Sequence, residues 1–339
     1  MEQEIRVAVY GATGYTGIEL IKILLRHPKV KIVALTSHSH AGKNIAEVFP
    51  FFEESLGNLV LTQDVEEEYD LAFLCLPHEN SLELVPKLLN QGKKVIDLSG
   101  AYRVKRPEIY PEYYGFEHGY PDILKKAVYG LPEIYRKLIK DAQLIANPGC
   151  YPTSVLLALY PLLKEKIKVE KVVVTSLSGV SGAGRKPVQH FHFPEMFGDF
   201  FAYSLHKHRH VPEMEAVIQE IGGVSIFLRF SPVVVPVSRG MLSSISIFCE
   251  KVEPKELYTE VYKDEKFVKI VSEPPHVKYV LGTNLCLIHP IWDSRSNCLQ
   301  VISVIDNLGK GASSQAVQNF NIMMGLEEDI ALDSMPNFP

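Results

Sequence analysis

Apolar residues in the first 150 positions form short runs that alternate with stretches of helical spacing. A first helix is predicted from residue 18 to the His27-Pro28 pair, and a second over residues 81–89. Strand-like runs flank these helices at residues 5–10, 30–35, 71–76 and 95–98. Because parallel strands need crossover connections, this alternation predicts a parallel sheet with helices on its faces.

After residue 150 the pattern becomes rich in strands with short turns between them. This texture favours a mixed or antiparallel sheet. The predicted helices are one that follows Cys150 and continues through residues 155–159, one over residues 256–268, and a last one from about residue 312 to 324. Residues 106–136 lack a clear period and predict an extended loop with short helices. The predicted strands lie at residues 171–177, 224–230, 233–237, 242–249, 270–271, 285–288 and 299–305.

We therefore predict an α/β protein with an N-terminal Rossmann-type doubly wound parallel sheet and a second α+β domain with a mixed or antiparallel sheet. A chain of 339 residues is long enough for two such domains. The first domain is assigned to residues 1–149 and is completed by the C-terminal helix at about 311–339. The second, catalytic and oligomerisation domain is assigned to residues 150–310.

A glycine-rich turn follows the first predicted strand and opens the first helix. Glycines in this position let a dinucleotide pyrophosphate approach the helix N-terminus. The spacing is GxxGxxG, one residue longer at the first step than the common fingerprint, and glycines also make plain loops. The predicted cofactor residues here are Gly11, Thr13, Gly14, Tyr15, Thr16 and Gly17, together with Pro77 at the end of another strand.

The second strand ends in hydroxyl, imidazole and ammonium side chains rather than in Asp or Glu. An acidic residue there would hold the ribose 2′-hydroxyl of NAD, whereas Ser37, His38 and Lys43 can donate hydrogen bonds to a 2′-phosphate. We therefore expect NADP (NADPH), although a merely polar loop is the alternative for each residue.

Cys150 lies in the segment Asn147-Pro148-Gly149-Cys150, a turn that leads from a strand into a helix. A thiol at a helix N-terminus has a lowered pKa, and the thiolate is the nucleophile. The alternative is a small buried cysteine that fills space. We adopt that alternative for the four other cysteines, Cys75, Cys249, Cys286 and Cys298, which lie in apolar runs.

Three histidines occur within five residues at His206, His208 and His210, and Glu213 follows. One imidazole can serve as the general acid/base for Cys150, because its pKa lies near neutrality. The second imidazole and Glu213 can orient the first or contact substrate. A metal site is the rival interpretation, but no Asp, Glu or Cys completes an obvious ligand set, so we predict no metal.

Further cations and glycines follow predicted strands. Arg103 could bind a carboxylate or phosphate, or form a surface ion pair. The loop that contains Ser181, Gly182 and Arg185 suits an anionic ligand. Asn307 and Lys310 precede the last helix and form another candidate anion site.

The formal net charge of −5, with no basic block, gives no reason to expect nucleic acid or an anionic membrane as partner. No apolar run approaches the roughly 20 residues of a membrane span, and the charged start is not a signal peptide. The five scattered cysteines fit a reducing cytoplasm rather than a disulfide framework or structural zinc. We expect a cytoplasmic protein.

A dinucleotide site, a helix-capped cysteine and a nearby histidine together predict covalent hydride-transfer catalysis. The thiolate would attack an activated acyl carbon and form a thioester, which the reduced nicotinamide would convert to an aldehyde.

Five motifs in this order resemble the N-acetyl-γ-glutamyl-phosphate reductase family of the aspartate-semialdehyde dehydrogenase-like superfamily. The resemblance spans essentially the whole chain. The motifs lie at residues 11–17, 147–153, 179–185, 208–213 and 306–312. It implies an oxidoreductase of arginine biosynthesis that reduces N-acetyl-γ-glutamyl phosphate with NADPH and releases the semialdehyde and inorganic phosphate.

The resemblance also implies residue roles and assembly. Cys150 matches the nucleophile and His208 the acid/base, while Asn307 and Lys310 match a second cofactor loop. Substrate contacts are implied for Arg103, Arg185, His210 and Glu213. Homodimers or homotetramers joined through the second domain's sheet are expected. Two departures occur, at Gly100-Ala101-Tyr102-Arg103, where relatives often have Ala-Asp-Phe-Arg, and at Ser37-His38, where many have Ser-Arg.

Three rival functions stay open. The substrate could be the longer aminoadipyl phosphate of lysine synthesis, whereas aspartyl phosphate fits the local sequence less well. The chain could instead be a non-catalytic NADP sensor or scaffold, or a metal-dependent hydrolase built on the histidines.

Overall fold

The computed structural model describes residues 4–338 and divides the chain into two compact units. The first unit contains the chain up to Tyr110 together with Phe116–Pro148 and Ala312–Asp333. The second unit contains Pro111–Gly115, Gly149–Gly311 and the chain from Ser334 onward.

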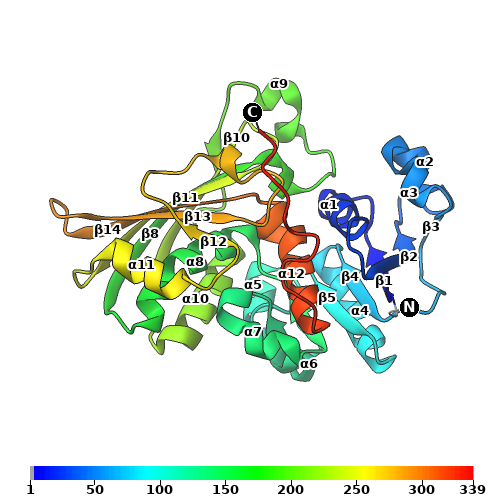
Figure 1. Ribbon diagram of the computed structural model, residues 1–339, viewed down its shortest axis with the longest axis horizontal. Helices are drawn as coiled ribbons and strands as arrows, with labels where there is room; N and C mark the ends of the chain where they lie inside the picture. The colour runs from blue at the N-terminus through cyan, green and yellow to red at the C-terminus, as the bar shows by residue number, and fades with distance from the viewer. Residues whose placement is uncertain (1–3, 339) are drawn as a thin grey trace. The chain divides into compact units, whose positions relative to one another are not determined.

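The first unit is built on a seven-stranded sheet whose order is β3-β2-β1-β4-β5-β7-β6, and every strand pair in it is parallel (Figure 1). Helices lie in the other connections between successive strands, whereas β3 and β4 are joined without a helix. The predicted doubly wound sheet is confirmed. Its strands are β1 (Ile5–Tyr10), β2 (Val30–Thr36), β3 (Leu61–Thr62), β4 (Leu71–Leu74), β5 (Lys94–Asp97), β6 (Val128–Tyr129) and β7 (Leu144–Ala146).

Helix α12 (Ser314–Met323) packs on α1 (Tyr15–Leu24), α7 (Pro132–Lys140) and β5, and all ten of its residues are buried. Its Asn319 side chain donates to Gly130 O at 2.8 Å and to Asn147 Oδ1 at 2.9 Å. The end of the chain thus completes the core of a unit that begins at the other terminus. The remaining helices are α2 (Ile45–Val48), α3 (Glu53–Leu56), α4 (His78–Asn90) and α6 (Pro121–Lys126), with single 3₁₀ turns η1 (Pro50–Phe52) and η2 (Pro107–Ile109).

The second unit holds a seven-stranded mixed sheet of order β12-β13-β14-β11-β8-β10-β9, which confirms the prediction for this half. Its strands are β8 (Val169–Gly179), β9 (Phe201–Ala202), β10 (Leu228–Val235), β11 (Met241–Cys249), β12 (Val268–Ile270), β13 (Cys286–Asp293) and β14 (Cys298–Ile305). The short helical segments are α5 (Tyr110–Tyr113), α9 (Phe193–Met196), η3 (Val180–Ala183), η4 (Gln189–Phe191), η5 (Val277–Tyr279) and η6 (Gly309–Ser313).

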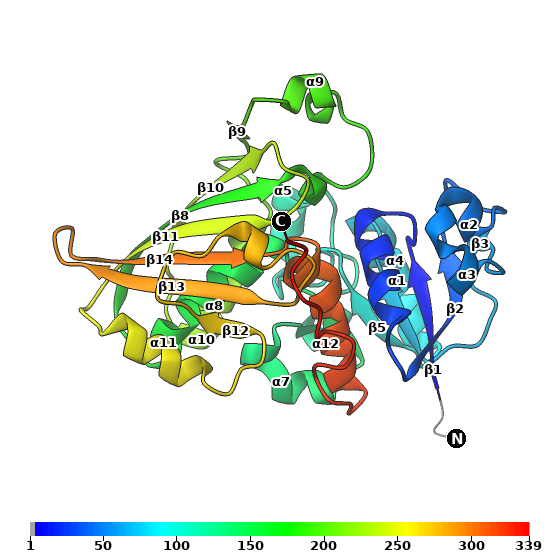
Figure 2. The same ribbon diagram turned by 45° about the horizontal axis from the view of Figure 1, so that its top comes forward.

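Three longer helices, α8 (Cys150–Lys164), α10 (His210–Gly222) and α11 (Pro254–Tyr262), lie on the same face of this sheet (Figures 1 and 2). Buried side chains alternate with half-buried ones along β11, and along β10 they alternate with half-buried side chains and the exposed Arg229. Buried serines link helix and sheet, because Ser154 Oγ lies 3.0 Å from Ser243 Oγ and 2.9 Å from Ser303 Oγ. The half-buried side chains face away from these helices.

Three local predictions were wrong. The helix predicted to reach residue 268 ends at Tyr262, because Val268 begins β12 and pairs with Cys286. The strands predicted on either side of Pro232 are one strand, β10, which starts only at Leu228. The segment expected to be a loop, residues 106–136, also supplies edge strand β6 and much of α7.

Candidate active site

The glycine turn between β1 and α1 has the backbone that a phosphate cradle requires. Gly11 has a φ of +78°, and a Cβ there would lie 2.2 Å from the carbonyl oxygen of Cys75. A Cβ on Gly17 would lie 2.5 Å from the carbonyl oxygen of Gly11. Only glycine fits either position, so the first turn of α1 stays close to the strand ends.

Gly14 is the N-cap of α1, and no side chain caps the free amides of this helix. Thr13 Oγ1 and Ser37 Oγ lie 2.8 Å apart and tie the turn to the end of β2. Tyr15 is 39% exposed, and Thr16 O accepts a hydrogen bond from Ser313 Oγ at 2.8 Å. These features fit a dinucleotide, because uncapped amides and the helix dipole bind phosphate.

The other predicted cofactor residues of this unit differ in exposure. Ser37 is buried beside the turn, whereas His38, Lys43 and Pro77 are exposed at the carboxyl ends of strands β2 and β4. Because the side chains of His38 and Lys43 are exposed, they can form hydrogen bonds with a 2′-phosphate. Burial raises the pKa of the Cys75 thiol to about 12, so that this cysteine beside the turn stays a neutral thiol.

Cys150 is the first residue of α8, and Gly149 is the N-cap with no side-chain cap. The N–H of Gly149 donates to Glu213 Oε1 at 2.9 Å, and Glu213 is fully buried on α10. Thr153 Oγ1 donates to Gly149 O at 3.0 Å. The nucleophile predicted from sequence therefore sits on a turn that is held from both sides.

His208 is 7% exposed and lies beside Tyr151, Tyr203 and Phe230. Burial, followed by the charge of Arg209, lowers the pKa of His208 to about 3, so its imidazole is neutral at pH 7. Burial also raises the pKa of the phenol of Tyr203. His208 and Tyr203 are thus uncharged hydrogen-bonding groups.

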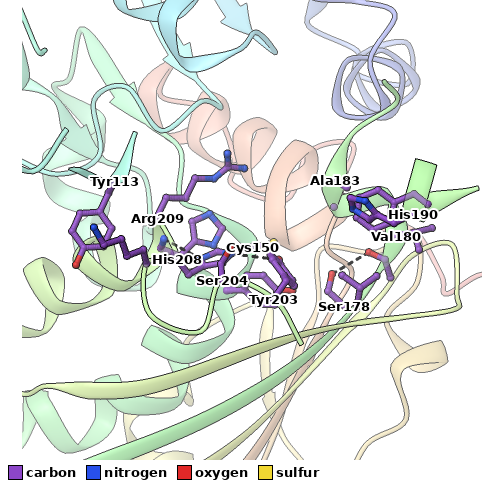
Figure 3. A pocket seen from close by; sticks show the side chains of 17 residues that line it. Tyr113, Cys150, Ser178, Val180, Ala183, His190, Tyr203, Ser204, His208 and Arg209 are labelled. Atoms are coloured by element: carbon purple, nitrogen blue, oxygen red, sulfur yellow. Dashed lines mark hydrogen bonds between the residues drawn. The ribbon is translucent and has the colours of Figure 1, made fainter. Parts of the chain in front are cut away.

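Cys150 and His208 both line a cavity of about 450 Å³ in the second unit (Figure 3). Lys207, Arg209 and His190 bring nitrogen donors to the same cavity, which suits an anionic substrate. The other lining side chains are Tyr113, Tyr151, Ser178, Val180, Ala183, Phe191, Tyr203, Ser204, His210 and Val234, with the backbones of Gly179 and Gly182.

The residues predicted to bind substrate are distributed unevenly. His210 and Gly182 line the cavity, and Arg185 is exposed in the loop that follows η3. Ser181 Oγ accepts a hydrogen bond from Asn307 at 2.9 Å. Arg103 belongs to the first unit, where it is 9% exposed and donates to the carbonyl oxygens of Asn147 and Leu98 at 2.8 Å each.

Asn307 and Lys310, predicted as cofactor residues, lie in the second unit and are buried. Asn307 Oδ1 accepts the N–H of Gly240 at 2.6 Å, and its amide nitrogen donates to Ser181. Lys310 Nζ lies 5.8 Å from the ring centre of Phe267. Through its hydrogen bonds to Gly240 and Ser181, Asn307 helps to fix the loop that contains Gly182.

Several cavity residues were not among the sites predicted from sequence, most notably Tyr151, Tyr203 and His190. Tyr151 follows Cys150 directly in the sequence, so its position next to the predicted nucleophile could have marked it as a site residue. Tyr203 and His190 lie in an aromatic, irregular segment without a motif, and nothing local marked them. No group of three or more His, Cys, Asp or Glu side chains within residues 4–338 could hold a metal ion.

Two family models match consecutive parts of the chain. Residues 6–142 match the model described as semialdehyde dehydrogenase, NAD binding domain. Residues 150–307 match semialdehyde dehydrogenase, dimerisation domain. No helix within residues 4–338 is long and apolar enough to cross a membrane.

Among solved structures, aspartate semialdehyde dehydrogenase II of Vibrio cholerae, complexed with ASA, superposes with a TM-score of 0.75 at 19% identity, covering 96% of this chain and 99% of that one. The Candida albicans aspartate semialdehyde dehydrogenase with NADP gives 0.73 at 15% identity, covering 97% and 100%. These likenesses establish the fold.

Sequence relatives are far more similar. The N-acetyl-γ-glutamyl-phosphate reductase of Aquifex aeolicus (strain VF5) is 58% identical over 100% of both chains. That of Dehalococcoides mccartyi (strain ATCC BAA-2266 / KCTC 15142 / 195) is 46% identical over 98% of this chain and 99% of its own. This chain belongs to the N-acetyl-γ-glutamyl-phosphate reductase family.

Proposed function

We propose that this enzyme reduces N-acetyl-γ-glutamyl phosphate to N-acetylglutamate 5-semialdehyde and inorganic phosphate, with NADPH, in arginine biosynthesis. The observation that carries the proposal is the position of Cys150 at the N-terminus of α8, in one cavity with His208. The identity of the substrate is inferred from the relative that is 58% identical over the whole chain, an N-acetyl-γ-glutamyl-phosphate reductase.

Cys150 forms the covalent intermediate. Its sulfur attacks the acyl carbon, the bond from that carbon to the phosphate oxygen breaks, and a thioester remains on the enzyme. The helix N-terminus stabilises the thiolate. Lys207 and Arg209 bind the anionic groups of the substrate from the rim of the cavity.

The glycine turn of the first unit binds the cofactor. The amides around Gly14 would hold the pyrophosphate, and Ser37, His38 and Lys43 would bind the 2′-phosphate. Bound NADPH supplies the hydride that converts the thioester to the aldehyde. His208 is the acid/base that acts on the oxygen of the acyl group, both while the thioester forms and while the thioester is reduced.

The second unit also forms the subunit interface of a homodimer or homotetramer. The match to a dimerisation domain and the half-buried sheet face opposite α8 support this. Ser244 lies on that face between Thr175 and Ile302. Ser244→Arg should dissociate the oligomer in analytical ultracentrifugation, whereas Glu250→Arg, exposed just after β11, should leave it intact. An oligomer that survives Ser244→Arg would place the interface elsewhere.

A cytoplasmic location is part of this proposal. It is supported by the five cysteines, none of which forms a disulfide bond.

The deciding experiment measures the reverse reaction, phosphate-dependent reduction of NADP⁺. N-acetylglutamate semialdehyde and its aminoadipate homologue are compared side by side, with Cys150→Ser as the inactive control. One methylene should change kcat/KM by about 10- to 200-fold in favour of the glutamate compound. Preference for the homologue would reassign the substrate and keep the nucleophile. No phosphate-dependent activity with either would refute the proposed reaction.

A further inference from the structure

A buried ion pair joins two turns at one end of the mixed sheet. Arg239 lies in the turn between β10 and β11, and Asp306 follows β14 directly. Arg239 Nε donates to Asp306 Oδ1 at 3.1 Å, and Arg239 Nη2 lies 2.6 Å from Oδ2. The carboxylate side chain is fully buried, and the arginine side chain is 19% exposed. Because a planar guanidinium fits both oxygens of a carboxylate in one geometry, the pair fixes the two turns relative to each other.

Asp306 also binds the backbone of two further segments. Its Oδ2 accepts the N–H of Gly282 at 2.6 Å, and its carbonyl oxygen accepts the N–H of Gly311 at 2.9 Å. A Cβ on Gly311 would lie 2.8 Å from the Cβ of Cys150, so the segment after Asp306 packs directly against the first residue of α8. Asp306 therefore connects the turn of Arg239 with the segment beside the nucleophile.

The turn at residues 237–240 holds one wall of the cavity, formed by residues 179–183. A Cβ on Gly179 would lie 2.8 Å from the Cα of Arg239, so the two backbones are in contact. In Figure 3, Val180 and Ala183 of this wall lie on the opposite side of Cys150 from Arg209. The first three residues of the wall donate their N–H groups to carbonyl oxygens of the turn, Gly179 to Gly240 at 3.0 Å, Val180 to Val237 at 3.0 Å and Ser181 to Ser238 at 3.1 Å.

Stability alone is a poor explanation for this ion pair. The cost of removing two charges from water offsets their attraction, so a buried pair is weak evidence for stability. The wall, in contrast, needs to be held in place. Residues 182–187 are exposed, so the packing of side chains supports the wall little, and its position rests on the bonds to the turn.

We propose that Arg239 and Asp306 are positioning residues, whose ion pair sets the place of the wall at residues 179–183 relative to Cys150 and thereby the fit of the substrate. The use of the cavity as the substrate site rests on the proposed function. Neither residue of the pair is among the described residues that line the cavity, so both act through the wall rather than on the substrate.

Two variants test the pair in the reverse reaction. Arg239→Lys keeps the charge and removes the planar fork, whereas the double variant Arg239→Gln/Asp306→Asn removes both charges and leaves no buried charge unpaired. We expect the KM for the semialdehyde to rise about threefold in Arg239→Lys and about tenfold in the double variant, with kcat within about threefold of the parent.

The KM separates positioning from a merely structural role, because it does not depend on how much of the enzyme is folded. A merely structural pair would lower the thermal midpoint and leave the KM of the folded enzyme unchanged. If both variants fold and keep a KM within about twofold of the parent, the proposal is wrong.

A matched control lies in the first unit, where Arg136 Nε is 2.9 Å from Glu328 Oε2 and Arg136 Nη2 donates to Oε1 at 3.2 Å. Arg136→Gln removes an arginine fork of the same kind from a place remote in the chain from the wall. We expect it to lower the thermal midpoint and to leave the KM for the semialdehyde unchanged. An equal rise of KM in Arg136→Gln would make the effect a general loss of stability and would refute the proposal.

Hydrogen exchange tests the same pair without substrate. In the double variant and in Arg239→Lys, the amides of Val180 and Ser181 should exchange faster than in the parent, because their acceptors lie on the turn that the pair fixes. Mass spectrometry of a peptide that covers residues 177–184 measures this, and Arg136→Gln should show the parent's rate. Unchanged exchange in the double variant would overturn the proposal.

The two proposals fail in different ways. Faster exchange of the wall in variants of an enzyme without phosphate-dependent activity would refute only the reaction. An active enzyme whose folded variants keep the parent's KM would refute only the role of Arg239 and Asp306.

Discussion

The N-termini of helices α1 and α8 have nearly the same backbone and different uses. Each helix follows a parallel strand and has glycine as N-cap, with φ and ψ of −77° and 164° at Gly14 and −69° and 156° at Gly149. Neither has a side-chain cap or an acidic residue in its first turn. Both therefore present free amides and a positive dipole end.

What surrounds each terminus makes the difference. At α1 the packing glycines bring the turn against the strand ends and leave the amides uncapped for an external anion. At α8 the N–H of Gly149 is already bound by the carboxylate of Glu213, and the first side chain is the thiol of Cys150. In the proposed function, the N-terminus of α1 binds the charge of a ligand, and the N-terminus of α8 stabilises a charge of the protein itself. The local backbone is common to both, and the neighbouring side chains decide its use.

The largest expected effect comes from removing the thiol. Cys150→Ser should lower kcat by about 10⁴-fold or more, because the nucleophile acts as one unit with its donors. Cofactor affinity should persist, since the cofactor turn belongs to the other unit. Isothermal titration with NADP⁺ beside the kinetic assay measures both. A variant that lost both together would show that the two helix termini are not independent.

The reciprocal substitution is Gly17→Ala, which puts a Cβ 2.5 Å from the carbonyl oxygen of Gly11. We expect NADP⁺ affinity to fall about 10²-fold and the free energy of unfolding to fall by about 1–3 kcal/mol through overpacking. Gly119→Ala is the matched control, because a Cβ there would have open space. Alkylation of Cys150 should stay unchanged in both. Normal affinity in Gly17→Ala would remove the turn from the cofactor site.

Unfolding at acid pH tests whether the imidazole of His208 is neutral in the folded protein. The folded-state pKa of His208 is about 3, far below its ordinary value, so the unfolded chain binds the extra proton. The free energy of unfolding is therefore highest above about pH 6.5 and falls by about 1.4 kcal/mol per pH unit from this group as pH drops toward 3. Urea unfolding of the parent and of His208→Gln should differ by this slope. Equal slopes would mean that His208 is accessible to protons.

The smallest effect concerns the carboxylate at α8. Glu213→Gln keeps an oxygen for the Gly149 N–H and removes a negative charge near the helix N-terminus. The thiolate should become more favourable by about 0.3–1 kcal/mol, so iodoacetamide should react with Cys150 about two- to fivefold faster at pH 7. Glu215→Gln on the same helix is the control. A slower reaction would show that the charge itself supports the thiolate.

Sequence reasoning succeeded where the signal is local. The glycine turn and the Asn147-Pro148-Gly149 turn each lie within a few residues of the chain. Helix α8 begins at Cys150 as expected, and α1 begins at Tyr15, three residues before the predicted start at residue 18. The alternation of strands and helices likewise predicted the parallel sheet. Such features depend on torsion angles and periods that the chain carries in itself.

It failed where distant pairing decides. Pro232 was expected to interrupt a strand, yet its carbonyl oxygen faces β9, since it accepts the N–H of Tyr203. Its missing N–H faces the same short edge strand, so no bond to β8 is lost. Tyr203 was missed for a related reason, because its place beside His208 comes from the β9–β10 pairing. The sequence also could not show that Arg103 and Glu213, which stay predictions as substrate ligands, form hydrogen bonds with backbone groups.

Helix α12 has a consequence for the order in which the protein is made. The first unit needs residues 312–333 for its core, and these follow residues 149–311 in the chain. All of residues 149–311 must be synthesised before that core can close. Residues 149–311, which form most of the second unit, can therefore fold on the nascent chain while the first unit is still incomplete. A chain that stopped before α12 would lack part of the core of the first unit, whereas the sheet of the second unit would be complete.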